Sequence, residues 1–133
     1  MNYYISRTIE SGFDKAVSEV VEALKAEGFG VLTDIDVAAT MKQKLGIEFR
    51  PYRILGACNP PLAHKALSAE DKVGVMLPCN VIVQEASAGK IEVAAIDPRA
   101  AMERVGNPAL TDLASEIADK LTRVILRFSR AGR

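Results

Sequence analysis

The sequence predicts a single α/β domain in which helices pack on a mixed sheet. Apolar and polar residues alternate in several short segments, as they do in half-buried strands. Longer segments repeat apolar residues at spacings of three and four, which indicates amphipathic helices. The segments follow one another in the order β-α-β-α-β-α-β-β-α, and packing helices on one sheet buries the apolar faces of both. A chain of 133 residues has the usual length of one domain, so we expect the domain to span residues 1–133.

The first helix is predicted between two strands. Residues 3–8 alternate apolar and polar positions and predict the first strand. Ser11 followed by Asp14 resembles a capping box, which predicts a helix start with Ser11 as the N-cap. Gly28 ends this helix, and residues 29–35 predict the second strand.

The middle of the chain continues the alternation. Asp36 is a good N-cap for a short helix that Gly46 closes. Residues 49–57 predict the third strand, with a proline tolerated near its beginning. Asn59, followed by proline, has the residue types that favour the start of the next helix.

A hairpin is predicted after that helix. Residues 73–77 and 81–85 are strand-like, and Pro78 between them indicates an edge or a bulge. A turn at 87–89 leads into an alternating strand at 90–96, which completes the hairpin. This hairpin argues against an all-parallel, doubly wound sheet.

Two helical segments close the chain. Asp97 and the proline after it begin a short helical turn. Asn107 and its following proline begin the longest helix, whose apolar residues line one face as far as Phe128.

The charge pattern gives no sign of a nucleic-acid partner. Seventeen basic residues balance seventeen acidic ones, whereas a duplex-binding surface shows a basic excess or stripe. We interpret Arg123, Arg127, Arg130 and Arg133 as a solvated face near the C-terminal end of the helix, where the dipole favours cations. The alternative interpretation is a nucleic-acid patch.

The N-terminal sequence and the cysteine content predict a cytoplasmic protein. The first residues lack the basic start and apolar run of a signal peptide. No apolar stretch approaches the ~18–20 residues that cross a bilayer, so we expect no membrane partner. Two cysteines without an export signal indicate reduced thiols.

Two cysteine-containing segments are the candidate site. Cys58-Asn59 and Pro78-Cys79-Asn80 each place a thiol and an amide at a break in regular structure. If the third strand, its helix and the next strand form a βαβ unit, the two strands are neighbours and the thiols approach one another. Tyr52, with Arg50 and Arg53, could add a phenol and a cation to a cleft. Both cysteines could equally be small buried hydrophobic residues.

The chemistry of these thiols stays open at this point. The helix start after Cys58 would lower its pKa, but Pro60 and Pro61 remove amide donors that such a site needs, for a thiolate or a phosphate. His64 is a conceivable base for Cys58, although its place off the apolar stripe indicates a surface residue.

Carboxylate, metal and cofactor chemistry have little support in the sequence. Asp34 and Asp36 share one side of a strand and could divide acid and base roles. The simpler interpretation makes Asp36 a helix cap and leaves Asp34 in solvent. No CxxC pair, P-loop or dinucleotide fingerprint occurs, so we predict no metal site and no cofactor.

Several segments resemble the family called domain of unknown function 302. They are residues 28–30, 35–37, 45–46, 52–60, 77–81, 95–98 and 107–108, and they cover nearly the whole chain. Asp71-Lys72 departs from the pattern, which would have an acidic residue followed by proline. The resemblance implies a compact α/β fold and a homodimer from bacteria or archaea, and it implies no established activity. The family pattern also draws attention to Tyr52, Cys58, Asn59, Pro78, Cys79 and Asn80.

Three functional hypotheses follow. The first is a homodimeric small-ligand-binding module with a cleft lined by Tyr52, Cys58, Asn59, Cys79 and Asn80. The second is a thiol-dependent enzyme or redox protein that uses Cys58 or Cys79, which requires one thiol of lowered pKa. The third is a structural or partner-binding subunit with an apolar surface patch and no pocket.

Overall fold

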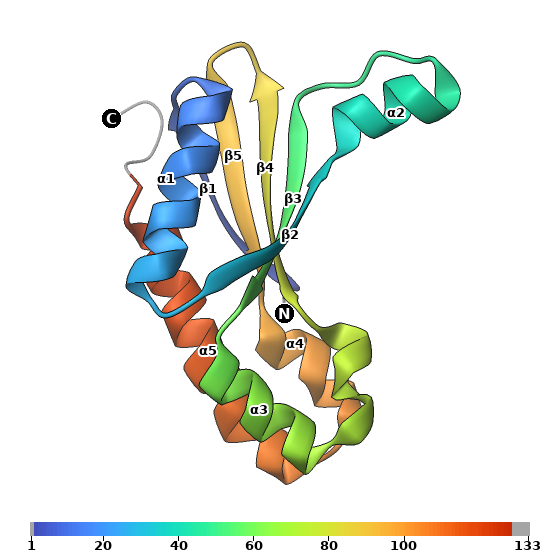
Figure 1. Cartoon of the computed structure of the whole chain (residues 1–133). Coiled ribbons are helices and arrows are strands. Elements are labelled where there is room, and N and C mark those ends of the chain that lie inside the picture. The colour runs from blue at the N-terminus through green and yellow to red at the C-terminus, as the bar shows by residue number, and fades with distance from the viewer. Residues whose placement is uncertain (1, 129–133) are drawn as a thin grey trace.

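Five antiparallel strands form one twisted sheet at the centre of the computed structural model, which describes residues 2–128 (Figure 1). The strands are β1 (Tyr4–Glu10), β2 (Gly30–Asp36), β3 (Tyr52–Cys58), β4 (Cys79–Ser87) and β5 (Lys90–Ile96). Their order across the sheet is β1-β5-β4-β3-β2, so β1 and β2 form the two edges. The predicted α/β domain with helices packed on one sheet is confirmed.

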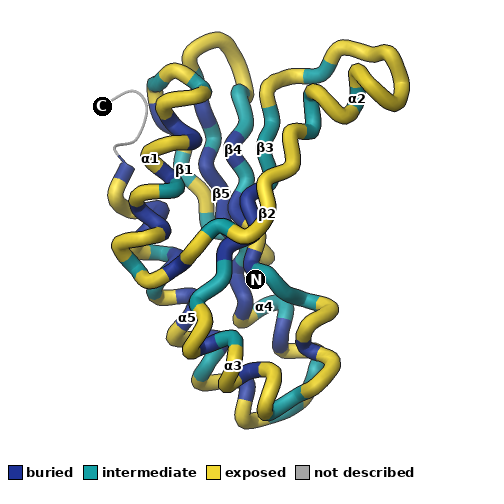
Figure 2. Tube along the Cα trace, viewed as in Figure 1, coloured by how far each residue is buried: buried dark blue, intermediate teal, exposed yellow. Residues whose placement is uncertain are grey.

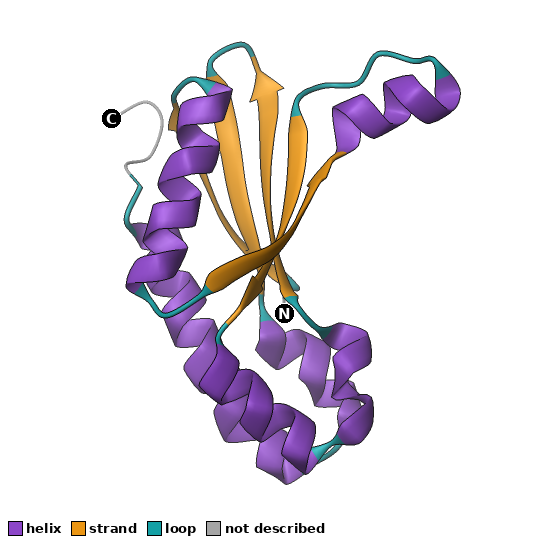
Figure 3. Cartoon of the chain, viewed as in Figure 1, coloured by secondary structure: helices purple, strands orange, loops and turns teal. Residues whose placement is uncertain are grey.

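The helices are α1 (Phe13–Ala26), α2 (Val37–Leu45), α3 (Pro60–Ala69), α4 (Pro98–Met102) and α5 (Pro108–Leu126). Two 3-10 segments, Asp71–Met76 and Glu103–Val105, follow α3 and α4. Figure 3 shows α1 and the end of α5 beside the sheet, whereas α2 projects from its upper end and α3 and α4 lie below it.

The sheet is not mixed as the sequence predicted, because all four strand pairings are antiparallel. The helices α2 and α3 leave the sheet and return to it at the same end, so each connects two neighbouring antiparallel strands (Figure 1). Only α1 runs back along the sheet, and it connects the two edges, which are not neighbours. The strands β1 and β2 point the same way, but within residues 2–128 the alternation of strands and helices arises without any pair of neighbouring parallel strands.

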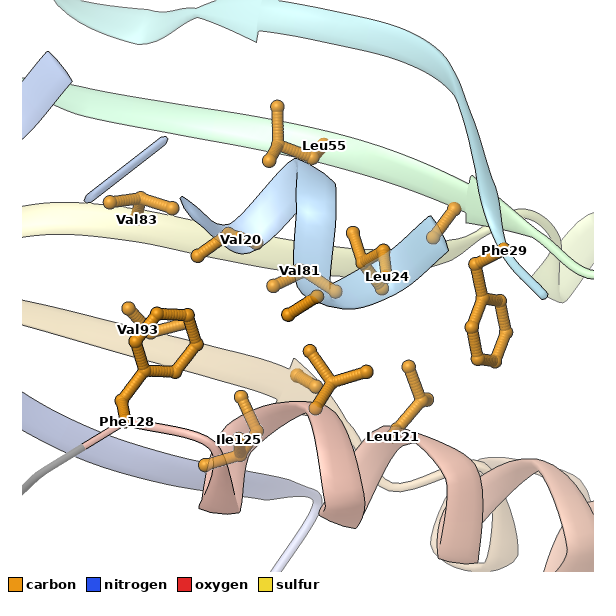
Figure 4. Packing of buried hydrophobic residues seen from close by; sticks show 14 of the residues in the cluster. Val20, Leu24, Phe29, Leu55, Val81, Val83, Val93, Leu121, Ile125 and Phe128 are labelled. Atoms are coloured by element: carbon orange, nitrogen blue, oxygen red, sulfur yellow. The ribbon is translucent and has the colours of Figure 1, made fainter. Parts of the chain in front are cut away.

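The main hydrophobic core lies between one face of the sheet and the helices α1 and α5. Figure 4 shows side chains of both helices meeting strand residues, with Val20 and Leu24 from α1 and Leu121 and Ile125 from α5. Because alternate strand residues point to one face, β3, β4 and β5 supply Leu55, Val81, Val83 and Val93 to the same layer. Burying each such side chain contributes roughly 1.5–3 kcal/mol before the entropy of ordering is subtracted.

A second, smaller cluster lies below the sheet. It joins Ala66 of α3, Val73 of the first 3-10 segment, Met102 of α4, and Leu110 and Ala114 of α5. The cluster holds α3 and α4 against the first half of α5. It therefore fixes the stretch of chain between the two candidate cysteine segments.

No helix within residues 2–128 covers the opposite face of the sheet, and we call it the open face (Figure 1). Tyr4, Ser6 and Thr8 of β1 are exposed there, and Ile82 and Gln84 of β4 are half-buried. Figure 2 shows that β2 and α2 are also almost entirely exposed. The alternation of the sequence thus separates a buried face from one that is accessible.

Two element predictions are wrong. Residues 73–77 are not a strand, because they belong to the 3-10 segment, and Val73 packs in the small cluster. Ser11 is not the N-cap of α1, because Gly12 takes that position and the Ser11 hydroxyl donates to the Gly12 carbonyl. The third strand also begins later than predicted, at Tyr52.

Other local predictions are confirmed. Asp36 and Asn59 accept hydrogen bonds at the starts of α2 and α3, as Asn107 does at the start of α5. Gly28 and Gly46 follow their helices with φ of 86° and 68°, the left-handed region that glycine adopts without strain. The hairpin of β4 and β5 is present as predicted.

Candidate functional site

The structure divides the five predicted site residues between two places. Ala57 pairs with Cys79 in the β3–β4 ladder, so Cys58 and Cys79 lie close to one another at the lower end of the sheet. Both thiols, together with Asn59, line a small cavity that we call the thiol cavity. Tyr52 and Asn80 instead line a larger groove on the open face.

The thiol cavity has room for little more than a water molecule. Its volume is about 30 Å³, and its walls include Leu62, Ala66 and Ile117. Asn59 is already engaged there, because its Oδ1 accepts from the Leu62 amide and its Nδ2 donates to the Glu27 carbonyl, each at 3.4 Å. The predicted cleft around the cysteines is therefore too small for an organic ligand.

The two thiols have different surroundings. Cys79 is buried, and this burial, followed by the proximity of Cys58, raises the pKa of its thiol to about 11. Cys58 is half-buried, and neither cysteine forms a disulfide. At neutral pH, Cys79 therefore holds its proton and is a poor nucleophile.

The larger site is the open-face groove, with a volume of about 410 Å³. Its floor consists of Ile82, Ala94 and Ile96, which are neighbours because Ile82 pairs with Ala94 across β4 and β5. Its other lining residues are Tyr3, Tyr4, Tyr52, Asn80, Gln84, Glu92 and Ala95. An apolar floor with a few polar groups around it is the usual composition of a ligand pocket.

A chain of hydrogen bonds orders one end of this groove. Arg50 Nε donates to Gln84 Oε1 over 2.7 Å, and Gln84 Nε2 donates to Glu92 Oε1 over 2.8 Å. The Arg50 guanidinium also lies over two rings, 4.6 Å from the centre of Phe49 and 5.5 Å from that of Tyr52. These contacts hold Gln84 and Glu92 in fixed orientations at the groove.

Two tyrosines form the other end of the groove. The rings of Tyr3 and Tyr4 meet edge to face with their centres 5.0 Å apart. The Tyr3 carbonyl accepts from the Asp97 amide at 2.8 Å, so the start of α4 holds this segment in place. Asp97 is itself 5% exposed, and hydrogen bonds from Arg99 lower the pKa of its carboxyl.

Sequence analysis missed most residues of this groove. Tyr3, Tyr4, Gln84 and Glu92 lie within predicted strands, but the strand pattern alone does not tell which face of the sheet stays uncovered. The register brings Tyr52 beside Gln84 and Gln84 beside Glu92. The available signal was the alternation of polar and aromatic residues on the side away from the core.

The other candidate residues have structural roles or lie apart from the groove. His64 is exposed on α3 and lines neither the groove nor the thiol cavity. Asp36 caps α2, and Arg53 donates from Nε to Asp34 Oδ1 at 2.7 Å, which lowers the pKa of Asp34. The two aspartates therefore show no acid–base division.

The C-terminal arginines are only partly described. Arg123 is paired with Glu27 at 3.0 Å, and Arg127 is exposed. Arg130 and Arg133 lie outside the described residues. The described pair thus fits a solvated helix face.

A second groove of similar volume, about 410 Å³, lies between α4 and α5. Arg99, Met102 and Thr111 are among its lining residues, and none of the predicted site residues reaches it. Arg99 is already bound to both carboxylate oxygens of Asp97, at 3.0 and 2.9 Å. The Arg99 guanidinium of this groove is therefore already engaged within the chain.

Residues 2–128 hold neither a cluster of metal ligands nor a membrane-spanning helix. No group of three or more His, Cys, Asp or Glu side chains could hold a metal ion there. Over the same residues, no helix has the length and apolar character that crossing a membrane requires.

Known proteins resemble this chain over most of its length. The model of the family described as Domain of unknown function DUF302 matches residues 5–128. The chain is also similar to the crystal structure of an uncharacterized conserved protein DUF302 from Bacillus stearothermophilus, with a TM-score of 0.89 and 28% sequence identity. That match covers 97% of this chain and 100% of the other. The comparison with curated proteins found no match.

Proposed function

The chain belongs to the family described as domain of unknown function DUF302, and from that premise we propose that it is a homodimeric module that binds a small ligand in the open-face groove. The observation that carries this proposal is the groove itself, whose volume of about 410 Å³ falls within the usual size of ligand pockets. Of the predicted site residues, Tyr52 and Asn80 belong to this ligand site.

The groove combines a fixed shape with polar groups that a ligand can use. Its floor belongs to the central strands β4 and β5, which are rigid because each is paired on both sides. The hydroxyl groups of Tyr4 and Tyr52 and the amide of Asn80 make no hydrogen bond within the described part of the chain. A ligand over Ile82 and Ala94 would therefore gain apolar contact and find donors and acceptors around it.

A dimer surface is proposed on a projecting arm, which we define as residues 30–51, from β2 through α2 to the start of β3. The helix α2 has no buried residue, and a free helix of nine residues is marginal in water. Leu32 and Ile35 are exposed at its base, and Leu45 and Ile47 at its tip, with 66% and 45% of the last two accessible. Exposed apolar residues gathered in one segment are typical of an interaction surface.

A second copy of the chain is the partner that we propose for this arm. Size exclusion with light scattering on the double variant Leu45→Glu with Ile47→Glu tests whether dimer formation depends on the arm. We expect a monomer, while the control Val75→Glu, at a residue 88% exposed in the 3-10 segment, stays dimeric. A monomeric unsubstituted protein, or a dimeric double variant, would contradict the proposal.

The thiol-dependent alternative has weaker support. It needs one activated cysteine, and burial raises the pKa of Cys79 rather than lowering it. Within residues 2–128, the Cys58 thiol has no hydrogen bond to any titratable base that could activate it. The two free thiols do support the inference of a reducing, cytoplasmic compartment.

Ligand binding is tested with the neutral, environment-sensitive dye Nile red and two tryptophan variants. Ala94→Trp fills the floor of the groove, whereas the matched control Ala86→Trp places the same ring on exposed β4 outside it. We expect saturable fluorescence with the unsubstituted protein and the control, and its loss with Ala94→Trp. Equal binding by both variants would place the dye elsewhere and refute this ligand site. Independently of the dye, native mass spectrometry of freshly purified protein gives the mass of any ligand retained from the cell.

A further inference from the structure

The open-face groove has an electrostatic character that narrows the class of its ligand. Among the lining residues in the described part of the chain, Glu92 is the one charged side chain. The second groove, between α4 and α5, is lined by both Arg99 and Glu103. Its walls therefore do not favour a ligand of one charge. A charged ligand entering the open-face groove therefore meets a negative group and no positive one on its walls.

Only one of the two carboxylate oxygens of Glu92 is hydrogen-bonded within the described residues. Its Oε1 accepts from Gln84 Nε2 at 2.8 Å, and Gln84 Oε1 in turn accepts from Arg50 Nε at 2.7 Å. Gln84 thus bonds at both ends of its amide and lies between Arg50 and Glu92. Glu92 Oε2 has no hydrogen-bond partner within residues 2–128. A charged hydrogen-bond donor on the ligand could bind this oxygen without displacing any existing contact.

Aromatic faces add to the same preference. Tyr3, Tyr4 and Tyr52 all line the groove, and the face of a phenol ring attracts cations. The molecule already uses this attraction at one side of the groove, where the Arg50 guanidinium lies 5.5 Å from the centre of Tyr52. At the other end, the rings of Tyr3 and Tyr4 meet edge to face, and neither ring has a cation over it among the described residues.

The sheet register sets the shape of the ligand. Glu92 lies opposite Thr8 and Ile96 lies opposite Tyr4, so the carboxylate and the tyrosine pair are four residues apart along the strands. At about 3.3 Å per strand residue this is roughly 13 Å, and Ala94 forms the apolar floor between the two ends. An extended molecule fits this arrangement better than a compact one.

We infer that the ligand of the open-face groove is an elongated organic cation, with an ammonium group at Glu92 and an apolar or aromatic body that extends over Ala94 towards Ile96 and Tyr4. The inference rests on the proposed ligand site and adds the charge and the orientation of what binds there. A carboxylate or phosphate ester of the same shape would be repelled by Glu92, and Arg50, the cation at this end of the groove, already donates to Gln84 and is not among the lining residues.

The test uses three probes with one apolar body and different head groups: 4-phenylbutylamine, 4-phenylbutan-1-ol and 4-phenylbutanoate. Each is titrated against groove-bound Nile red at pH 7 and low salt. We expect the amine to bind roughly three- to tenfold more tightly than the alcohol, from one partly exposed ion pair and a cation–π contact. The carboxylate should be the weakest of the three, and added salt should reduce the differences.

Two charge-neutralising variants locate the effect. Glu92→Gln should abolish the preference for the amine over the alcohol, while Glu85→Gln should keep it, because Glu85 lies outside the groove on the same strand pair. If the alcohol binds as well as the amine, or if Glu92→Gln keeps the preference, the inference is wrong although the groove still binds ligands. If Ala94→Trp leaves Nile red binding intact, the ligand site itself is refuted, so the two failures are distinguishable.

Discussion

Pro78 packs directly on Gly56: its Cγ atom lies 2.6 Å from the position that a β-carbon on Gly56 would occupy. The hydroxyl of Thr33 on β2 also reaches that position. Gly56 pairs with Asn80 of the groove, and Pro78 lines the thiol cavity, so this contact lies between the two candidate sites. Only a residue without a side chain lets β2, β3 and the start of β4 come this close.

Replacing Gly56 should therefore destabilise the protein. Gly56→Ala forces a methyl group against Pro78 and Thr33, and overpacking of this kind costs about 1–3 kcal/mol. The measurement is the midpoint of urea unfolding. Gly30→Ala is the matched control, since no atom lies within 4 Å of its added carbon, and it should shift stability by less than about 0.5 kcal/mol. Equal midpoints for the two variants would contradict the close approach.

The Asp97–Arg99 pair should make stability depend on pH in the acid range. Because its partners lower the pKa of Asp97 in the folded state, the pair stabilises fully above the pKa of an unfolded aspartate, about 4. That contribution is lost as the pH falls through the lower folded pKa. Asp97→Asn keeps a capping oxygen and removes the charge, so it should cost about 1.5–3 kcal/mol at pH 7 and much less at acid pH.

Urea unfolding of Asp97→Asn at several pH values checks this dependence. Asp34→Asn serves as the comparison, because the Asp34–Arg53 pair is exposed at the surface and should contribute at most about 1 kcal/mol. A penalty for Asp97→Asn that stays constant from pH 7 to the acid limit would show that the charge of Asp97 does not stabilise the fold.

The two thiols should differ in their reactivity with iodoacetamide. Cys58 is half-buried and should be alkylated in the folded protein, whereas Cys79, with its pKa raised to about 11, should react only after unfolding. Mass spectrometry of Cys58→Ala and Cys79→Ala gives each rate separately. In denaturant, both thiols should react at similar rates. Faster labelling of Cys79 than of Cys58 in the native state would favour the thiol-dependent alternative.

Asn107 should stabilise the small cluster below the sheet through both polar atoms of its side chain. Its Oδ1 accepts from the Ala109 amide at the start of α5, and its Nδ2 donates to the Ala69 carbonyl at the end of α3, each at 3.0 Å. Asn107→Ala loses both and should cost about 1–2 kcal/mol. Asn107→Ser keeps a cap and loses the bond to Ala69, so its thermal midpoint should lie between the other two. A serine variant as stable as the unsubstituted protein would show that the bond to Ala69 does not contribute to stability.

The sequence predicted local structure better than the arrangement of the sheet. Caps such as Asp36 and Asn59 act through the next few backbone amides, so their residue types suffice to predict them. Strand direction depends on where each helix returns to the sheet, and no residue of α3 encodes that by itself. Residues 73–77 failed for a similar reason, because Val73 is apolar for the small cluster and not for a strand.

The candidate site was predicted in part for the same physical reason. The cysteine segments stand out in the sequence, and they do meet, because Ala57 pairs with Cys79. Their meeting produces a cavity for about one water molecule, since side chains of α3 and α5 fill the remaining space. The groove combines Tyr4 and Glu92 from strands that only the tertiary structure places side by side, so Tyr52 and Asn80 were the part within reach of sequence analysis.

The helices α3 and α5 each belong to both hydrophobic clusters. On α3, Leu62 packs in the main core and Ala66 in the small cluster below the sheet. On α5, Ile117 packs in the main core and Ala114 in the small cluster. Each of these pairs is separated by a single helical turn, so neither cluster can separate from the other without fraying a helix at that turn. The lower part of the molecule is consequently no independent folding unit, and its loss of structure is coupled to that of the sheet in one cooperative transition. The arm beyond Val31 contributes no residue to either cluster, so it can open without disrupting them.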